Sequence, residues 1–175
     1  MKAFVFIILA LFTGITVKSQ TPGSLSVTVT TKASGQPRNY APRNCIVVWV
    51  EDQNGNFIKT LLVNAQARRR NLSNWASATK ASGSIFNSVD AITGATNNSH
   101  GTRTCTWDGT DSKGKLVADG NYTIHMELSD TEQPGLLSAY TFTKGPDPVN
   151  HMPADQRSFT SVSIRWVPQQ LTSKK

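Results

Sequence analysis

The sequence has few of the residues that build catalytic or metal centres. Its 175 residues include two cysteines and three histidines, and these form neither a C-x-x-C pair nor a Cys/His cluster with metal-ligand spacing. The patterns G-x-S-x-G and H-E-x-x-H, which mark serine hydrolases and zinc proteases, are also absent. One carboxylate pair, Asp108 and Asp111, lies in a Gly-rich turn, where capping or a calcium contact is favoured over acid–base catalysis. These absences disfavour a free-standing hydrolase or metalloenzyme.

Long apolar runs are also scarce, and the longest lies at the N-terminus. Lys2 precedes the apolar run 3–15, and small residues follow it up to Ser19. This order is typical of a signal peptide, residues 1–19, with cleavage near Ser19. The run is shorter than the ~20 residues of a spanning helix, and no cysteine follows it to carry a lipid. We therefore expect a periplasmic or secreted protein without stable membrane insertion.

Positive charge is in modest excess. The formal net charge is +7, and loss of Lys2 and Lys18 with the signal peptide lowers it to +5. No basic stretch is interleaved with aromatic residues, so the composition does not favour a nucleic-acid partner. The densest cluster could face an anionic phosphate, an acidic partner or solvent, of which solvent is the ordinary case; it comprises Arg68, Arg69 and Arg70.

The two cysteines leave two alternatives open. Cys45 and Cys105 each lie in a strand-like run. In an oxidising compartment an even count permits one disulfide, either across strands or between sheets. Two buried free thiols are the equal alternative.

The apolar pattern of residues 20–175 has period two far more often than period 3.6, which predicts an all-β domain. The segment 65–80 is the exception, with apolar residues at helical spacing and Asn71 or Ser73 as candidate N-caps. We expect a single antiparallel immunoglobulin-like β-sandwich with one short helix. Its strands are predicted at 25–30, 45–50, 57–63, 104–107, 121–129, 137–144 and 158–167.

One short segment carries the most specific pattern in the chain. The residues from Asp90 to Thr96 read D-A-I-T-G-A-T and fill every fixed position of D-x-x-[S/T]-G-A-T. Gly94 and Ala95 are small and let the backbone bend, while the Thr93 hydroxyl can bond to the local backbone. We predict that the segment lies on a loop rather than in a strand. An ordinary polar turn between strands is the alternative interpretation.

The segment resembles the acceptor sequence on which a periplasmic FAD-dependent transferase esterifies FMN to a threonine hydroxyl. The resemblance makes Thr96 the position that carries the flavin through a phosphodiester. Asp90, Thr93, Gly94 and Ala95 correspond to the remaining fixed positions of that acceptor.

A second pattern, W-D-G-x-D-x-x-G-x-x-x-x-D-G-x-Y, runs from Trp107 to Tyr122. It resembles the immunoglobulin-like repeat of the flagellar hook-capping protein, with both aromatic residues as candidate core residues. The chain as a whole resembles the exported domain-of-unknown-function 2271 family. The resemblance lies in the order of its features: the export signal, Tyr40-Ala41-Pro42-Arg43-Asn44, the Trp49 strand, the arginines, Trp75, the acceptor-like segment and this repeat.

That resemblance implies an immunoglobulin-like fold and FMN attached outside the cytoplasm, beside membrane electron-transfer proteins. Many relatives place a proline-glycine pair soon after the acceptor, whereas this chain has Asn97-Asn98-Ser99-His100-Gly101. The departure concerns the shape of the loop and not the acceptor threonine.

Two functions follow as hypotheses. In the first, the protein carries FMN covalently on Thr96 and transfers electrons between a membrane electron-transfer protein and an exported acceptor. The candidates to stack on or charge-balance the flavin are Trp49, Trp75 and the three arginines. In the second, the chain is a cofactor-free immunoglobulin-like binding or structural module of the periplasm.

Overall fold

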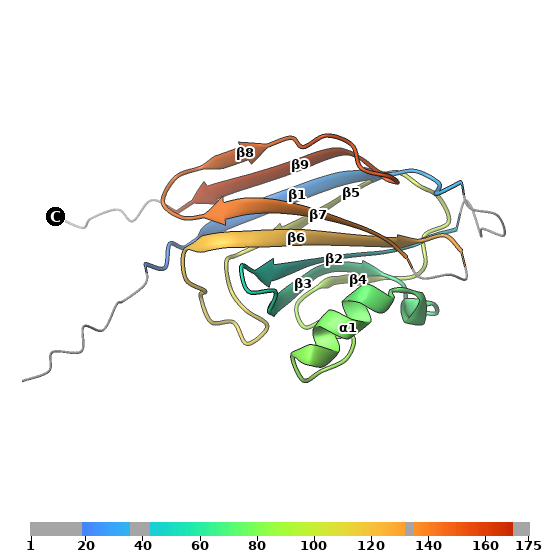
Figure 1. Ribbon diagram of the computed structural model, residues 1–175, viewed down its shortest axis with the longest axis horizontal. Helices are drawn as coiled ribbons and strands as arrows, with labels where there is room; N and C mark the ends of the chain where they lie inside the picture. The colour runs from blue at the N-terminus through green and yellow to red at the C-terminus, as the bar shows by residue number, and fades with distance from the viewer. Residues whose placement is uncertain (1–18, 36–42, 132–134, 170–175) are drawn as a thin grey trace, which may run out of the picture.

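The computed structural model describes residues 19–35, 43–131 and 135–169, which form two β-sheets and one α-helix (Figure 1). The predicted signal peptide lies outside these residues, apart from Ser19, as do Tyr40, Ala41 and Pro42. The two sheets face each other as a sandwich, so the predicted fold class is confirmed.

One sheet has four strands in the order β5-β1-β9-β8, and all neighbours are antiparallel. Its strands are β1 (Gly23–Thr31), β5 (Thr102–Trp107), β8 (Val149–His151) and β9 (Phe159–Pro168). The other sheet has five strands in the order β4-β3-β2-β6-β7. They are β2 (Cys45–Asp52), β3 (Phe57–Asn64), β4 (Ile92–Gly94), β6 (Gly120–Ser129) and β7 (Leu136–Lys144).

The sandwich core follows from the period-two pattern of the strands. In β1, Leu25, Val27 and Val29 are at most 1 % exposed, while the alternating serine and threonines face outward. The W-D-G repeat contributes Trp107 and Tyr122, whose rings pack edge-on with centroids 5.3 Å apart. Both rings belong to this core, as the sequence predicts.

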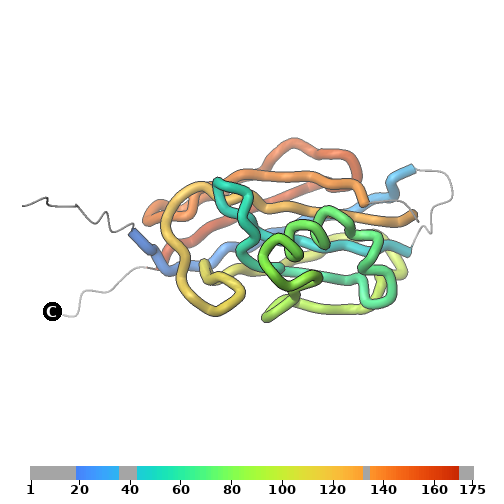
Figure 2. Tube along the Cα trace, turned by 60° about the horizontal axis from the view of Figure 1, so that its bottom comes forward, coloured from blue at the N-terminus to red at the C-terminus, as the bar shows by residue number. Residues whose placement is uncertain are grey.

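The central strand β2 is buried on both faces. Ile46, Val48 and Val50 face the sandwich core, whereas Cys45, Val47 and Trp49 belong to a second apolar layer on the outer face. The cover of this second layer is helix α1 (Ser73–Ala81), preceded by the 3₁₀ helix Arg69–Asn71. Figure 2 shows the helix lying across the outside of the five-stranded sheet.

The N-terminus of α1 is capped by a residue from the sheet. The prediction of Asn71 or Ser73 as N-cap is wrong, because Leu72 occupies that position and makes no side-chain cap. The carboxylate of Glu127, on β6, instead accepts hydrogen bonds from the backbone N–H groups of Asn74 and Trp75 at 3.2 and 2.9 Å. Glu127 is fully buried, and burial raises the pKa of its carboxyl group.

A buried ion pair at the edge of the five-stranded sheet also holds the segment just before β1. Lys144 on β7 is fully buried, and its Nζ lies 2.8 Å from Oδ1 of Asp119. Asp119 also accepts hydrogen bonds from the backbone N–H and the hydroxyl of Thr21, at 2.8 and 2.7 Å. Although burial opposes ionisation, the bonds from Lys144 and Thr21 lower the pKa of Asp119 to about 2.

We predict that Asp119→Ala lowers the free energy of unfolding at pH 7 by about 3–5 kcal/mol, because Lys144 is left buried without its counter-ion. The pKa of Asp119 is lower in the folded state, so its contribution is complete above about pH 4. It is lost as pH falls from about 4 to 2. Urea denaturation from pH 2 to 7 should show that the free energy of unfolding depends less on pH in the variant than in the wild type. Exposed Asp147→Ala is the control, and an equal loss there would contradict the assignment.

Candidate functional site

The acceptor-like segment begins as an edge strand and then leaves the sheet. Ile92, Thr93 and Gly94 form β4, which pairs in parallel with Leu62, Val63 and Asn64 of β3. The prediction that the whole segment lies on a loop is therefore wrong for its middle three residues. A strand of three residues is too short for an alternating pattern to show, and a glycine in it reads as a turn. Ala95 and Thr96 follow without regular structure.

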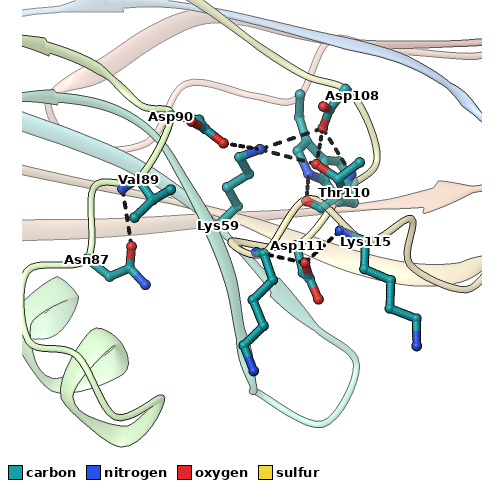
Figure 3. A network of polar contacts seen from close by, with 10 residues as sticks. Lys59, Asn87, Val89, Asp90, Asp108, Thr110, Asp111 and Lys115 are labelled. Carbon is teal, nitrogen blue, oxygen red and sulfur yellow. Dashed lines mark hydrogen bonds and ion pairs between the residues drawn. The ribbon is translucent and has the colours of Figure 1, made fainter.

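The first residue of the segment, Asp90, is tied to the W-D-G repeat through Lys59. The Nζ of Lys59 lies 3.5 Å from Oδ2 of Asp90 and 3.9 Å from Oδ1 of Asp108, and it donates to the Thr110 hydroxyl at 3.1 Å (Figure 3). Lys59 is 7 % exposed, and a buried ammonium group needs such partners. Asp90 has φ 57°, in the left-handed region.

Lys59 was missed from the sequence, although a signal exists. It is the single charged residue of the strand F-I-K-T-L-L-V-N, and charged residues are rarely buried unless they are paired. The pKa of Asp108 reflects the same network: burial opposes ionisation, but hydrogen bonds from Thr110 and the charge of Lys59 lower it.

The glycine of the segment lies against a neighbouring side chain. A Cβ atom on Gly94 would collide with the side-chain amide of Asn64 on β3, so a larger residue would have to displace that amide. This is a structural reason for the residue, beside the freedom to bend that the sequence suggests.

Thr96 lies half-buried beside one of the two cysteines. Its Oγ1 is 3.8 Å from Sγ of Cys45, which is 1 % exposed. Burial raises the pKa of the Cys45 thiol, and the Thr96 hydroxyl and the charge of Arg68 partly offset this. Cys45 belongs to the outer apolar layer and Cys105 to the sandwich core, where burial raises the pKa of Cys105 to about 12. Both are free thiols, so the structure has the second of the two alternatives.

A pocket of 390 Å³ opens beside the segment, within the range of about 300–1,000 Å³ that is usual for small-molecule sites. Trp75 from α1 and Phe86 from the link after it provide the aromatic wall, with ring centroids 5.4 Å apart. The remaining lining residues come from β3, the turn after it, the 3₁₀ helix, the link and the segment itself: Val63, Ala65, Gln66, Arg69, Ser88, Thr93, Gly94 and Ala95.

Phe86 is held in an uncommon conformation. Its φ is 59°, which bulky residues rarely adopt and which persists where the surroundings fix it. Its backbone N–H donates to the hydroxyl of Thr79 at 2.9 Å, and that buried hydroxyl donates to the carbonyl of Trp75 at 2.8 Å. The Arg69 guanidinium lies over the Phe86 ring, 5.0 Å from its centroid. The Phe86 side of the aromatic wall is thus held by the backbone hydrogen bond to Thr79 and by the Arg69 guanidinium.

The structure separates the residues that the sequence grouped as flavin contacts. Arg69 and Trp75 line the pocket. Burial raises the pKa of Cys45, which lies beside Thr96, and the charge of Arg68 partly offsets this rise. Arg70 is exposed and does not line the pocket. Trp49 is not a lining residue. It stacks on His125 with centroids 5.0 Å apart and donates to Glu51 at 2.7 Å, which is a packing role.

The family model for DUF2271, described as a predicted periplasmic protein, matches residues 24–147, well over half of the chain. The chain belongs to the DUF2271 family. The matched range contains the acceptor-like segment, the pocket and Lys59. No curated protein and no solved structure matches this DUF2271 chain. In the part that the structure describes, no helix is long and apolar enough to cross a membrane.

Because Lys59 contacts both Asp90 and Asp108, we predict that these two carboxylates are energetically coupled. Asp90→Asn or Asp108→Asn alone leaves Lys59 one carboxylate partner, so each should cost less than about 1 kcal/mol. The double variant leaves Lys59 only the neutral hydroxyl of Thr110 and should exceed the sum by about 0.5–1 kcal/mol, measured by urea denaturation in a double-mutant cycle. The cycle with Asp111, which bonds only within its own turn among the described contacts, is the control. Additive losses for Asp90 and Asp108 would contradict the bridge.

Proposed function

We propose that this protein carries FMN esterified to Thr96 and transfers electrons outside the cytoplasm. One observation carries the proposal: the segment that matches an FMN acceptor borders a pocket that contains two aromatic rings and an arginine. Thr93, Gly94 and Ala95 line that pocket, and the next residue is Thr96. An acceptor-like motif on an ordinary turn has no reason to adjoin such a pocket.

The attachment reaction needs a nucleophilic hydroxyl from this chain and FAD from its surroundings. The Thr96 Oγ attacks the phosphorus of the FMN half of FAD, and a new P–O bond forms. The pyrophosphate P–O bond breaks, AMP leaves, and the hydroxyl proton passes to a base of the periplasmic transferase. No oxidation or reduction takes place in this step.

The residues of the pocket suit the group. The half-buried Phe86 ring, backed by the buried Trp75, offers an apolar surface to a planar, largely apolar isoalloxazine system. Arg69 lines the same pocket, and the charge of Arg68 partly offsets the rise that burial causes in the pKa of Cys45 beside Thr96. Both cations are therefore our candidates to balance the negative charge of a phosphodiester on Thr96. When bound, FMN supplies one- and two-electron chemistry, while the chain supplies binding, orientation and charge.

The first test is covalent attachment itself. The chain is co-expressed with an FMN transferase, and we expect flavin fluorescence that survives denaturing electrophoresis, with a mass increase of one esterified FMN. Thr96→Val should abolish both signals. Thr28→Val, on the outer face of the other sheet, is the matched control and should retain them. Wild-type protein without flavin, beside a transferase that modifies a known acceptor, would leave the cofactor-free module as the function.

The second test concerns the pocket cation. In flavinylated protein, Arg69→Ala should lower the midpoint potential by roughly tens of millivolts, because a nearby positive charge stabilises the electron-rich reduced flavin. Arg70→Ala removes an equal charge from an exposed neighbour that does not line the pocket, and its shift should be smaller. Potentials are measured by spectroelectrochemical titration. Equal shifts for the two variants would place the flavin outside this pocket.

A further inference from the structure

Thr96 lies between two attachments of the segment to the five-stranded sheet. Upstream, β4 ends its pairing with β3 at the Gly94–Asn64 pair. Downstream, Asn97 exchanges two backbone hydrogen bonds with Asn44, both 2.9 Å long, and its side-chain amide donates to the Asn44 carbonyl oxygen Oδ1 at 3.3 Å. Asn44 directly precedes β2, so the chain crosses the end of β3 between these two points.

This crossing turns the Thr96 hydroxyl toward the protein. Its Oγ1 contacts the thiol of Cys45, which is 1 % exposed on the outer face of β2. Transfer of a phosphoryl group requires the attacking oxygen, the phosphorus and the leaving oxygen to lie roughly in line, with a base within reach of the hydroxyl proton. In the folded arrangement the Thr96 oxygen faces a buried thiol, so in-line attack requires Thr96 to turn away from Cys45.

We infer that Thr96 is modified from an opened conformation, in which the Asn44–Asn97 pair is broken and residues 95–98 leave the sheet to enter the transferase as an extended peptide. The inference rests on the proposed function and adds which conformation of this chain the transferase binds. Asn44 and Asn97 are then positioning residues that set how often the acceptor is available.

The contacts on either side of Thr96 favour opening on the downstream side only. Upstream, the segment is anchored by the β3–β4 pairing and by Lys59 at Asp90. Downstream, the anchor is an isolated bridge outside any strand. Opening breaks two backbone hydrogen bonds, one side-chain hydrogen bond and the contact with Cys45, each of modest net strength, so the opened form is a minor state that thermal fluctuation can reach. The upstream anchor ends at Gly94, and the small residue Ala95 follows it, so this point can act as a hinge.

A disulfide across the bridge tests the inference. The residues of a hydrogen-bonded antiparallel pair have Cα atoms about 5.5 Å apart, which is within the range of disulfide geometry. Asn44→Cys and Asn97→Cys are therefore combined in a Cys45→Ala background, and the purified protein is incubated with FAD and transferase. We expect flavin incorporation at least about ten-fold slower in the oxidised protein than in the same protein after reduction. Cys45→Ala alone should not respond to reductant.

Asn97→Pro tests the opposite direction, because it removes the N–H that donates to the Asn44 carbonyl. Incorporation should become several-fold faster, and the backbone amide of Asn44 should exchange with deuterium faster while that of Val47, inside β2, does not change. This exchange measurement reports opening independently of any transferase.

The outcomes separate the two proposals. If the oxidised disulfide variant is modified as fast as the reduced one, Thr96 reacts in place and the opened conformation is wrong, while covalent FMN stands. If wild type and all variants stay unmodified by a transferase that is active on another acceptor, the proposed function falls and this inference falls with it. Slower incorporation in the oxidised protein alone, reversed by reductant, supports both.

Discussion

The burial of β2 on both faces is the constraint on which the rest of the structure depends. A two-sheet sandwich buries only the inner face of each sheet, but here the outer face of β2 carries Val47 and Trp49 as well as Cys45. Apolar surface of this size must be covered, and the segment after β3 covers it with α1. The pocket forms at the margin of that cover, between Trp75 and the end of β3.

The same cover explains why a carboxylate is buried in the sheet. The position of Glu127 in β6 alternates with core residues, so in an uncovered sheet it would face solvent. Under α1 it loses water but gains the unpaired N–H groups and the positive end of the helix dipole. The helix is thereby positioned by a specific polar contact, and Trp75, whose N–H is one of the two donors, is positioned with it.

Sequence patterns predicted the parts of the fold that depend on local periodicity. β1 alternates cleanly, β2 reads as a dense central strand, and the helical spacing around Trp75 predicts α1. The strands β4 and β8 were not predicted, because three residues give no period and their pairing depends on distant partners. The site shows the same limit: the acceptor-like segment is recognisable from its residues, whereas the partners of Lys59, the position of Phe86 and the Asn44–Asn97 bridge depend on tertiary contacts.

The covalent attachment that we propose is consistent with the open form of the pocket. Gln66, Arg69, Thr93 and Ala95 are exposed, and only Trp75 among the aromatic lining is fully buried. Such a site encloses one side of a flavin and would hold a diffusible one weakly, because affinity requires burial of most of the ligand. The proposed bond to Thr96 would remove this requirement, since a short tether would keep the flavin at a millimolar effective concentration beside the pocket. The open side would then leave the proposed redox group accessible to a partner protein, which a closed cavity would prevent.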